Sequence, residues 1–570
     1  MKEIIKRDWP YVLLLLILVL NCAVQCSLFG GSFFTLWDES YCLLKCRDAY
    51  EHIITGKTQW DLIAIQWFPY FDLTSKVQAS WASFILIVAT AINATIVSCH
   101  IFGKKSILRC FSVFLLLLLP TIGGEYASEI QNRMGWVTGI NYLVMQVFML
   151  GSSLSYFLLY YYAEKPILRL LSITLTGIFV GLSVFVILPS GCLLLFGYII
   201  LMIVLNRKDR KQLLGGLLGG LLGVVIAICY MHVFVANVSE IMNEMAFTSS
   251  YVVKSGAGYT PLSFLKMIGR LLLCYVFIIP FIYGSFKLSE ANNGIRKNIG
   301  WVVYLLLLTV ATVLIYQKTK YLPTTLLFVS IILPLVFSIR NHILQGNDKL
   351  LIAFLLLFPL IGAVGTNTSL LGRIGSFIFA WGFLWMVFEE KMEIKNFWYV
   401  TLGAILIVLI PVSYNSARIY YHHKEYNTER FIHGSTGVAE LSLTHQQLAY
   451  FENIFSIISQ YGFEPQKSVM FTSYTDYCTI YAFDAVLSSR FHLPHNYPFF
   501  PKEQMMEPDF IILNEEEVLY YHLSDMSWGW PEMFDSYEIG TPETICQKFI
   551  GDYAKNRILY CRKSLKQLGK

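Results

Sequence analysis

The chain has 570 residues, of which 56% are hydrophobic and only 14% charged, and its mean hydropathy is +0.56. An ordinary soluble domain carries about 25% charged residues. The composition therefore excludes a soluble enzyme, a disordered chain and a nucleic-acid-binding protein. It indicates an α-helical polytopic membrane protein.

Charge is distributed unevenly along the chain. Residues 1–414 hold 30 Lys and Arg against 19 Asp and Glu, a net charge of +11. Residues 415–570 hold 13 against 19, a net charge of −6, and are also richer in charged residues. We therefore predict two domains, a transmembrane domain over 1–414 and a small soluble α/β domain over 415–570.

Thirteen apolar segments in the first domain approach the length of about 20 residues that a membrane helix needs. The fifth and sixth are predicted to meet in a tight turn at Pro189, Ser190 and Gly191. The predicted spans are 10–33, 80–102, 107–123, 137–162, 168–188, 190–205, 213–235, 264–286, 299–315, 323–339, 350–364, 374–388 and 398–414.

Lys and Arg concentrate in the loops on one side of these spans. With the N-terminus inside, the inner segments carry nineteen Lys and Arg, and the outer loops, which are longer in total, carry nine. Positively charged loops stay in the cytoplasm. We therefore expect a multi-pass protein of a bacterial inner or plasma membrane, with a cytoplasmic N-terminus and an extracytoplasmic C-terminal domain.

The C-terminal segment contains signals for one helix and several strands. Thr444 and Gln447 form a capping-box pattern, apolar residues follow at helical spacing, and Gly462 is a typical helix stop. Strand-like runs follow at Ser468–Thr472, Phe510–Leu513 and Ile558–Cys561. This pattern predicts a small α/β fold.

The first external loop, about residues 35–79, is too long for a simple connection. It begins with Asp38, Glu39 and Tyr41 directly after the first span, and further aromatic residues follow. Adjacent carboxylates at a membrane surface are costly unless they are solvated, paired or bound to a metal. The alternative interpretation is an interfacial aromatic belt with solvated acids.

Two further acids, Glu125 and Glu129, follow the third span and share one helical face at i and i+4. Together with Asp38 and Glu39 they give four carboxylates for one external cleft. Such a cluster suits a general base, or hard-oxygen binding of a divalent cation. The alternative is that these carboxylates are ordinary acidic residues of loops, with no common site. The sequence establishes no cofactor, and a divalent cation stays open.

Cations lie on the same predicted side. Lys266 and Arg270 occupy the outer half of the eighth span at i and i+4, and Arg373 precedes the twelfth. Ionisable residues within a span usually face a cavity or an ion path, and Arg offers a bidentate fork to a phosphate. Snorkelling of the side chains to the interface is the alternative.

These features together resemble the GT-C membrane glycosyltransferases, above all the branch of protein O-mannosyltransferases and lipid A aminoarabinose transferases. The resemblance covers the architecture of residues 1–414 and rests on the acidic pair after the first span. By position, Asp38 and Glu39 match that pair, and Glu125 matches the second acidic position. The branch's lysine-proline-proline segment is missing after Tyr70, and no Asp-x-Asp occurs.

The resemblance implies a glycosyltransferase that moves a sugar from a polyprenyl-phosphate donor to a glycan, lipid or protein acceptor on the outer face. Asp38 would be the general base, assisted by Glu39 and Glu125. Lys266, Arg270 or Arg373 would bind the leaving phosphate, and Tyr41 and Glu129 would contact substrate. The membrane lipid is a partner, and nucleic acid is not.

Three other functions compete with this interpretation. A transporter or flippase of lipid-linked sugars usually has internal repeats and binding charges near the bilayer midplane. Neither pattern is evident in the sequence. A polymerase or ligase of the O-antigen type would use a large external loop between later spans, whereas the longest loop here is the first. An envelope scaffold would leave the acid and cation placement without a purpose.

Overall fold

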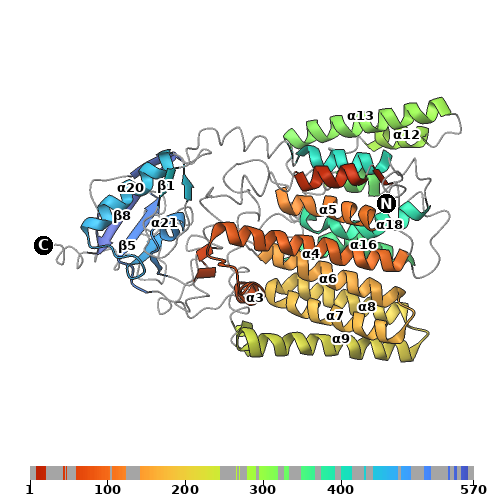
Figure 1. Cartoon of the computed structure of the whole chain (residues 1–570), viewed down its shortest axis with the longest axis horizontal. Helices are drawn as coiled ribbons and strands as arrows, with labels where there is room; N and C mark the ends of the chain where they lie inside the picture. Colours follow the sequence, from red (N-terminus) through yellow and green to blue (C-terminus); the bar gives the residue numbers. More distant parts are fainter. Residues whose placement is uncertain are drawn as a thin grey trace.

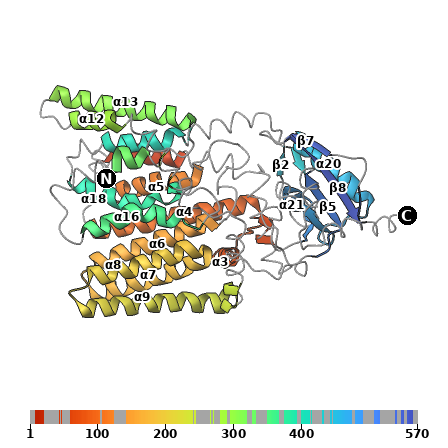
Figure 2. The same ribbon diagram turned by 180° about the vertical axis from the view of Figure 1, so that it is seen from behind.

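The computed structural model shows a bundle of apolar helices with a small mixed sheet at one end (Figures 1 and 2). The structure describes residues 8–9, 11–20, 43–44, 46–47, 59–102, 106–123, 142–239, 241–243, 265, 269, 279–289, 294–318, 326–332, 348–365, 374–391, 399–411, 413, 429–431, 441–443, 445–472, 477–488, 506–514, 537–539, 545–548 and 554–562.

The bundle is built from long helices and three short helical turns. In chain order they are α3 (Gln59–Trp67), α4 (Lys76–Phe102), α5 (Ile107–Gly123), α6 (Tyr142–Tyr162), α7 (Pro166–Val186), α8 (Leu188–Leu205), α9 (Arg210–Tyr230), η3 (Met231–Val235), α12 (Ile279–Ser289), α13 (Gly294–Lys318), η4 (Phe328–Ile332), α16 (Asp348–Ala363), η5 (Gly375–Ala380) and α18 (Trp381–Lys391). Unlabelled helical segments cover Tyr11–Leu20 and Tyr399–Pro411.

Six helices in the described part of the chain are long and apolar enough to cross a membrane, and five shorter apolar helices accompany them. Each of the thirteen predicted spans contains helical residues. The chain is therefore a polytopic helical membrane protein, as its composition predicted.

The break between α7 and α8 lies two residues earlier than the predicted turn. Only Ile187, in an extended conformation, separates the two helices, and Pro189 lies in the first turn of α8. Proline is tolerated there because the first N–H groups of a helix have no intrahelical partner. Gly191 then allows close approach, because a Cβ at this position would lie 2.7 Å from the Cα of Val184.

The most buried spanning helix, α6, packs on α8 through a stripe of polar pairs. Gln146 donates from Nε2 to the Ser190 hydroxyl at 2.7 Å. Seven residues further along α6, the Ser153 hydroxyl lies 3.1 Å from the Tyr198 hydroxyl. Another seven residues along α6, the Tyr160 hydroxyl accepts a hydrogen bond from Asn206 Nδ2 at 3.3 Å. All three pairs join neutral groups, so they fix the register of α6 and α8 without burying a charge.

The C-terminal sheet is mixed. Its path runs β4 (Val486–Leu487), β3 (Val469–Thr472), β5 (Phe510–Asn514), β8 (Ala554–Arg562) and β6 (Tyr537–Ile539), and β7 (Ile545–Lys548) also pairs with β8. Strand β3 is parallel to β4 and β5, whereas β8 is antiparallel to its neighbours. A separate antiparallel pair joins β1 (Glu429–Phe431) and β2 (Leu441–Leu443). The three predicted strands correspond to β3, β5 and β8.

Helix α20 (His445–Gln460) covers the sheet, and α21 (Tyr477–Ala482) connects β3 to β4. The predicted stop of α20 is correct. Gly462 has φ +75, its N–H donates to the Ser459 carbonyl, and the Phe463 N–H donates to the Ile458 carbonyl. This is a Schellman end, which favours glycine at the left-handed position. Phe451, Ile454 and Ile458 are fully buried, as their spacing predicted.

Buried apolar residues fall into two clusters. The larger extends from Tyr11 to Leu409 through the helix bundle. The smaller fills the C-terminal α/β unit, and it also includes Leu43 and Leu44 from the predicted first loop and Ala79 from the start of α4. The first loop therefore packs on the sheet domain as well as on the bundle.

Candidate functional site

The eight candidate site residues that the sequence singles out all lie outside the described residues. They are Asp38, Glu39, Tyr41, Glu125, Glu129, Lys266, Arg270 and Arg373. The described elements that flank them in sequence nevertheless have defined positions. Leu43 follows Tyr41 by two residues, Glu125 comes two residues after α5, and Ile374 follows Arg373 directly.

Helices α4, α5 and α6 fix the direction of the bundle. Ala79, near the start of α4, packs in the sheet-domain cluster. At the other end of α4, the Phe102 ring lies 6.3 Å from that of Tyr162, the last residue of α6. Arg109, at the start of α5, pairs with Asp8 near the N-terminus. Helix α6 therefore runs parallel to α4 and α5 runs antiparallel to both, so Gly123 and Tyr142 lie at the sheet end.

The α7–α8 turn and the end of α16 reach the same end. A Cβ on Gly365, which follows α16, would lie 2.8 Å from Pro189 at that turn. A Cβ on Gly362 would lie 2.6 Å from the Phe377 ring of η5. The start of η5, next to Arg373, is thereby fixed beside the end of α16. The chain positions flanking Asp38, Glu125 and Arg373 thus converge on the sheet end of the bundle.

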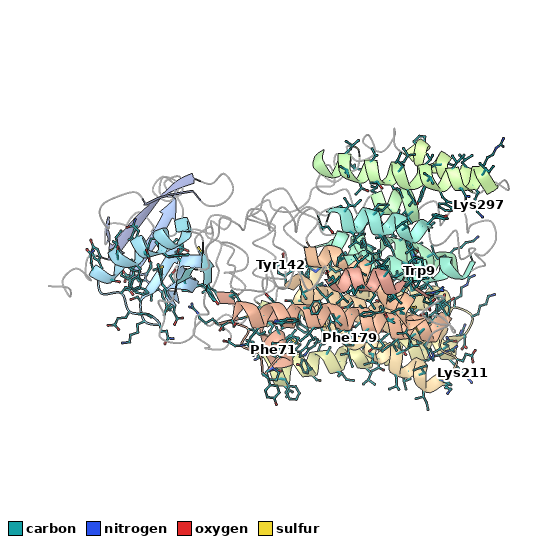
Figure 3. All side chains as sticks on the ribbon, turned by 45° about the horizontal axis from the view of Figure 1, so that its top comes forward. Trp9, Phe71, Tyr142, Phe179, Lys211 and Lys297 are labelled. Atoms are coloured by element: carbon teal, nitrogen blue, oxygen red, sulfur yellow. The ribbon has the colours of Figure 1, made fainter. Side chains whose placement is uncertain are left out.

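Some aromatic side chains of the first loop pack against the bundle, and others are exposed. The Trp67 indole Nε1 donates to the Tyr230 hydroxyl at 3.0 Å, and its ring meets Phe148 edge-on at 5.6 Å. Phe68 is buried, whereas Tyr70 is 96% exposed. Figure 3 shows Phe71 at this end of the bundle, with Trp9, Lys211 and Lys297 toward the other. Trp67 therefore anchors α3, whereas the Tyr70 side chain projects away from the protein.

Gln146 is a polar residue at this end that the sequence interpretation missed. It lies one turn from Tyr142 and is fully buried. Its Oε1 has no hydrogen-bond partner among the residues that the structure describes. The sequence signal that could have identified this residue is its side-chain amide within an otherwise apolar run. Buried polar atoms without a partner are uncommon in folded proteins.

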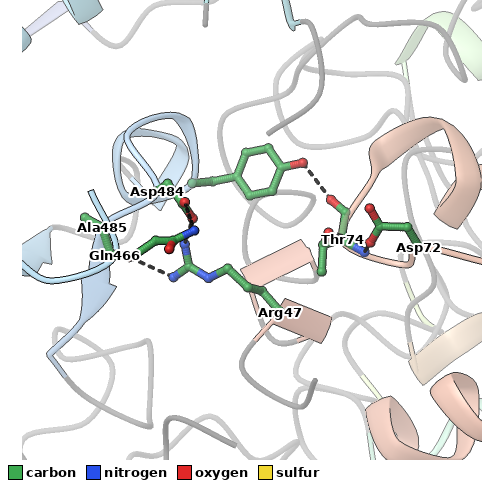
Figure 4. A network of polar contacts seen from close by, with 7 residues as sticks. Arg47, Asp72, Thr74, Gln466, Asp484 and Ala485 are labelled. Carbon is green, nitrogen blue, oxygen red and sulfur yellow. Dashed lines mark hydrogen bonds and ion pairs between the residues drawn. The ribbon is translucent and has the colours of Figure 1, made fainter. Parts of the chain in front are cut away.

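A second feature missed by the sequence joins the first loop to the sheet domain (Figure 4). The Arg47 Nη1 donates to Asp484 Oδ1 at 3.2 Å, and its Nη2 donates to the Ala485 carbonyl at 2.8 Å. The Tyr481 hydroxyl donates to the Thr74 carbonyl at 2.6 Å. The sequence does not predict this contact, because the partner of Arg47 is 437 positions away and nothing near Arg47 distinguishes it from other cations of the loop.

An exposed pair in the same domain contrasts with this contact. Lys467 Nζ lies 2.7 Å from Glu464 Oε2, with the two side chains 77% and 60% exposed. The hydrogen bond to Glu464 raises the pKa of the Lys467 ammonium. Exposed pairs of this kind contribute little to stability.

Within the described ranges, no group of three or more His, Cys, Asp or Glu is placed to hold a metal ion. The four carboxylates proposed for a cation lie outside these ranges. A divalent cation therefore stays a prediction.

The sequence matches no protein-family model and no curated protein sequence. Solved structures of similar architecture exist. An oligosaccharyltransferase of Archaeoglobus fulgidus, in complex with zinc and sulfate, is 12% identical with a TM-score of 0.47, over 95% of this chain and 72% of that one. ArnT from Cupriavidus metallidurans, bound to undecaprenyl phosphate, is 12% identical with a TM-score of 0.45, over 98% of this chain and 99% of that one.

Proposed function

We propose that the chain is a membrane glycosyltransferase that moves a sugar from a polyprenyl-phosphate donor to an acceptor at the sheet end of the bundle. One observation carries the proposal most directly. The described segments next to Asp38, Glu125 and Arg373 come from three distant parts of the sequence, and they converge on that end. A transferase site needs acids and a phosphate-binding cation at one mouth.

In the proposed reaction, Asp38 takes the proton of an acceptor hydroxyl, with Glu39 and Glu125 beside it. The acceptor oxygen then bonds to the anomeric carbon of the sugar, while the bond from that carbon to the phosphate oxygen breaks. The lipid phosphate leaves with the bonding electrons. Arg270, Lys266 or Arg373 stabilise the charge that develops on it. Tyr41 and Glu129 contact the substrate.

The proposed orientation has the sheet domain outside the cytoplasm. At the end of the bundle away from the sheet lie exposed cations, among them Lys165, Arg207 and Lys208 between the helices and Lys211 in the first turn of α9. Positively charged loops mark the cytoplasmic side. The donor would then be used on the extracytoplasmic face.

The second candidate is a transporter or flippase of lipid-linked sugars. Such proteins place binding charges near the bilayer midplane. In the described middle of the bundle, two polar pairs are neutral: the part-buried pair of Asn93 with Ser152 and the buried pair of Ser153 with Tyr198. This arrangement favours the transferase.

The deciding experiment uses the full chain in lipid nanodiscs with a synthetic, labelled undecaprenyl-phosphate sugar and candidate acceptors. A transferase releases undecaprenyl phosphate and labels the acceptor, whereas a flippase moves the donor without breaking it. Asp38→Asn keeps the shape and removes the base, so we expect turnover to fall by roughly 10²–10⁴-fold. Glu164→Gln, an exposed acid at the other end, is the matched control. A chelator added to the same assay tests the divalent cation.

A further inference from the structure

The contact between Arg47 and Asp484 is a buried ion pair between the first external loop and the sheet domain (Figure 4). The side chains are only 8% and 6% exposed. Arg47 bonds both to the carboxylate and to the neighbouring Ala485 carbonyl. Two directed bonds from one guanidinium fix an orientation as well as a distance.

Asp484 is itself held in a defined conformation. Its φ is 55, and that of Gln466 is 61, so both non-glycine residues adopt the left-handed region. They bond to each other: the Gln466 N–H donates to the Asp484 carbonyl at 2.7 Å, and Gln466 Nε2 donates to Asp484 Oδ2 at 2.8 Å. Residues in this region persist where their surroundings over-determine them. The carboxylate that receives Arg47 is thus preorganised.

The same two parts of the chain meet at further points. Leu43 and Leu44 are buried in the apolar cluster of the sheet domain, together with Ala79 of α4. The Tyr481 hydroxyl bonds to the Thr74 carbonyl just before α4. The loop is therefore held against the sheet domain both before and after residues 48–58 of the sequence.

Stability alone does not explain a charge pair at this place. Replacing a buried ion pair by apolar side chains of similar volume is often neutral or stabilising, because two charges must be desolvated to form the pair. What the pair adds is one defined geometry. The acids Asp38 and Glu39 precede Leu43 by only five and four residues, so the anchored segment directly follows the proposed catalytic acids.

We propose that Arg47 and Asp484 are positioning residues, which use the sheet domain to hold the segment carrying Asp38 and Glu39 at the mouth of the bundle. The catalytic consequence rests on the proposed function. The positioning itself does not, and it is measurable without any substrate.

The first test uses the full chain in nanodiscs with the double substitution Arg47→Met and Asp484→Asn, because asparagine tolerates the left-handed conformation at position 484. Since no unpaired charge remains buried, we expect a melting temperature close to that of the parent chain. Amide hydrogen exchange over residues 36–47 should become at least ~tenfold faster, because the segment opens locally. Unchanged exchange in this segment would overturn the proposal.

Two further variants keep the test decisive. Asp484→Asn removes the charge at nearly the same shape, so it replaces the double variant where that one does not fold. Faster exchange over 36–47 in Asp484→Asn supports the proposal, and unchanged exchange overturns it. Lys467→Ala breaks the exposed pair with Glu464 in the same domain and should leave exchange over 36–47 unchanged. A rise equal to that of the other variants also overturns the proposal.

Turnover then separates positioning from donor binding. We expect kcat to fall by about ten- to a hundredfold in the double variant, because small displacements of a catalytic group have effects of this size. The affinity for undecaprenyl phosphate should stay within about twofold of the parent value, since neither residue is assigned to the donor. If the parent chain transfers no sugar, the proposed function fails and hydrogen exchange still decides the positioning. If it does and the double variant keeps its kcat, the catalytic consequence of the positioning is wrong.

Discussion

Gly177 of α7 and Gly223 of α9 touch through their backbones. A Cβ atom on Gly223 would lie 2.8 Å from the Gly177 Cα, and it would collide with the Thr174 carbonyl oxygen. Close backbone approach at small residues drives helix association in membranes, where lipid tails are as apolar as the side chains. Because only 22% of the apolar window of α9 is buried, this contact contributes much of what holds α9 to the bundle.

We expect Gly223→Ala to lower the stability of the protein. The added methyl group has no space, and overpacking of this kind costs about 1–3 kcal/mol. Thermal unfolding in detergent, followed by the loss of monodisperse protein, measures the change. Gly215→Ala in the same helix is the matched control, because a Cβ there meets nothing within 4 Å. Equal melting temperatures for the two variants would contradict the packing argument.

Arg109→Met should destabilise the N-terminal helix. The Arg109 Nε and Nη2 atoms lie 2.7 and 2.6 Å from Asp8 Oδ1, and Asp8 is fully buried. The guanidinium also lies over the Tyr11 ring at 5.2 Å. Removing one partner of a buried pair costs about 3–5 kcal/mol, because the other charge stays desolvated. Lys208→Met, at an exposed position, serves as control, and a loss of similar size there would refute the assignment.

Local sequence signals predict the elements of this protein well. Helix α20 was expected up to Gly462 and ends at Gln460, with Gly462 in the left-handed position that the pattern requires. The apolar lengths of the spans were equally informative, because a membrane helix satisfies its own backbone hydrogen bonds. Each of these signals is contained within a single helix and the residues at its ends.

Contacts between distant segments could not be predicted from the sequence. The glycines of α9 are visible as a run, but nothing in the run identifies α7 as the partner. Arg47 and Asp484 carry no local mark of their pairing. Gln146 was hidden in a predicted span. The eight candidate site residues stay predictions, because they lie outside the described residues.

A substitution at Gly462 tests the end of α20. We expect Gly462→Val to cost about 1–2 kcal/mol, because the left-handed region disfavours residues with a Cβ. Gly462→Asn should cost less, since asparagine tolerates this region better. Steric clash is not the cause, as a Cβ at this position meets nothing within 4 Å. Chemical denaturation followed through the sheet domain measures both, and the reverse order would contradict the conformational explanation.

A fusion experiment tests the proposed sidedness. The described cations at the end remote from the sheet, such as Lys208 and Lys211, predict a cytoplasmic location for that end. A reporter active only in the cytoplasm should therefore be silent when fused after Lys570. The same reporter placed in the α8–α9 loop, after Lys208, should be active. A signal from the C-terminal fusion would reverse the orientation or change the number of spans.

Arg270→Ala should weaken donor binding more than Lys266→Ala. In the predicted eighth span, Lys266 would be one turn nearer to the interface and able to snorkel. A guanidinium within a span costs about 2.5–3.5 kcal/mol on insertion scales and needs a partner. A lipid phosphate supplies that partner. Losing a charge-assisted hydrogen bond costs about 1.5–3 kcal/mol, so the Kd for undecaprenyl phosphate should rise roughly 10- to 150-fold. Lys287→Ala, exposed at the opposite end, should leave the Kd unchanged.

If Arg270→Ala instead unfolds the protein while the surviving fraction keeps its affinity, then Arg270 is a structural partner. The phosphate site then lies elsewhere, and Arg373 becomes the next residue to substitute.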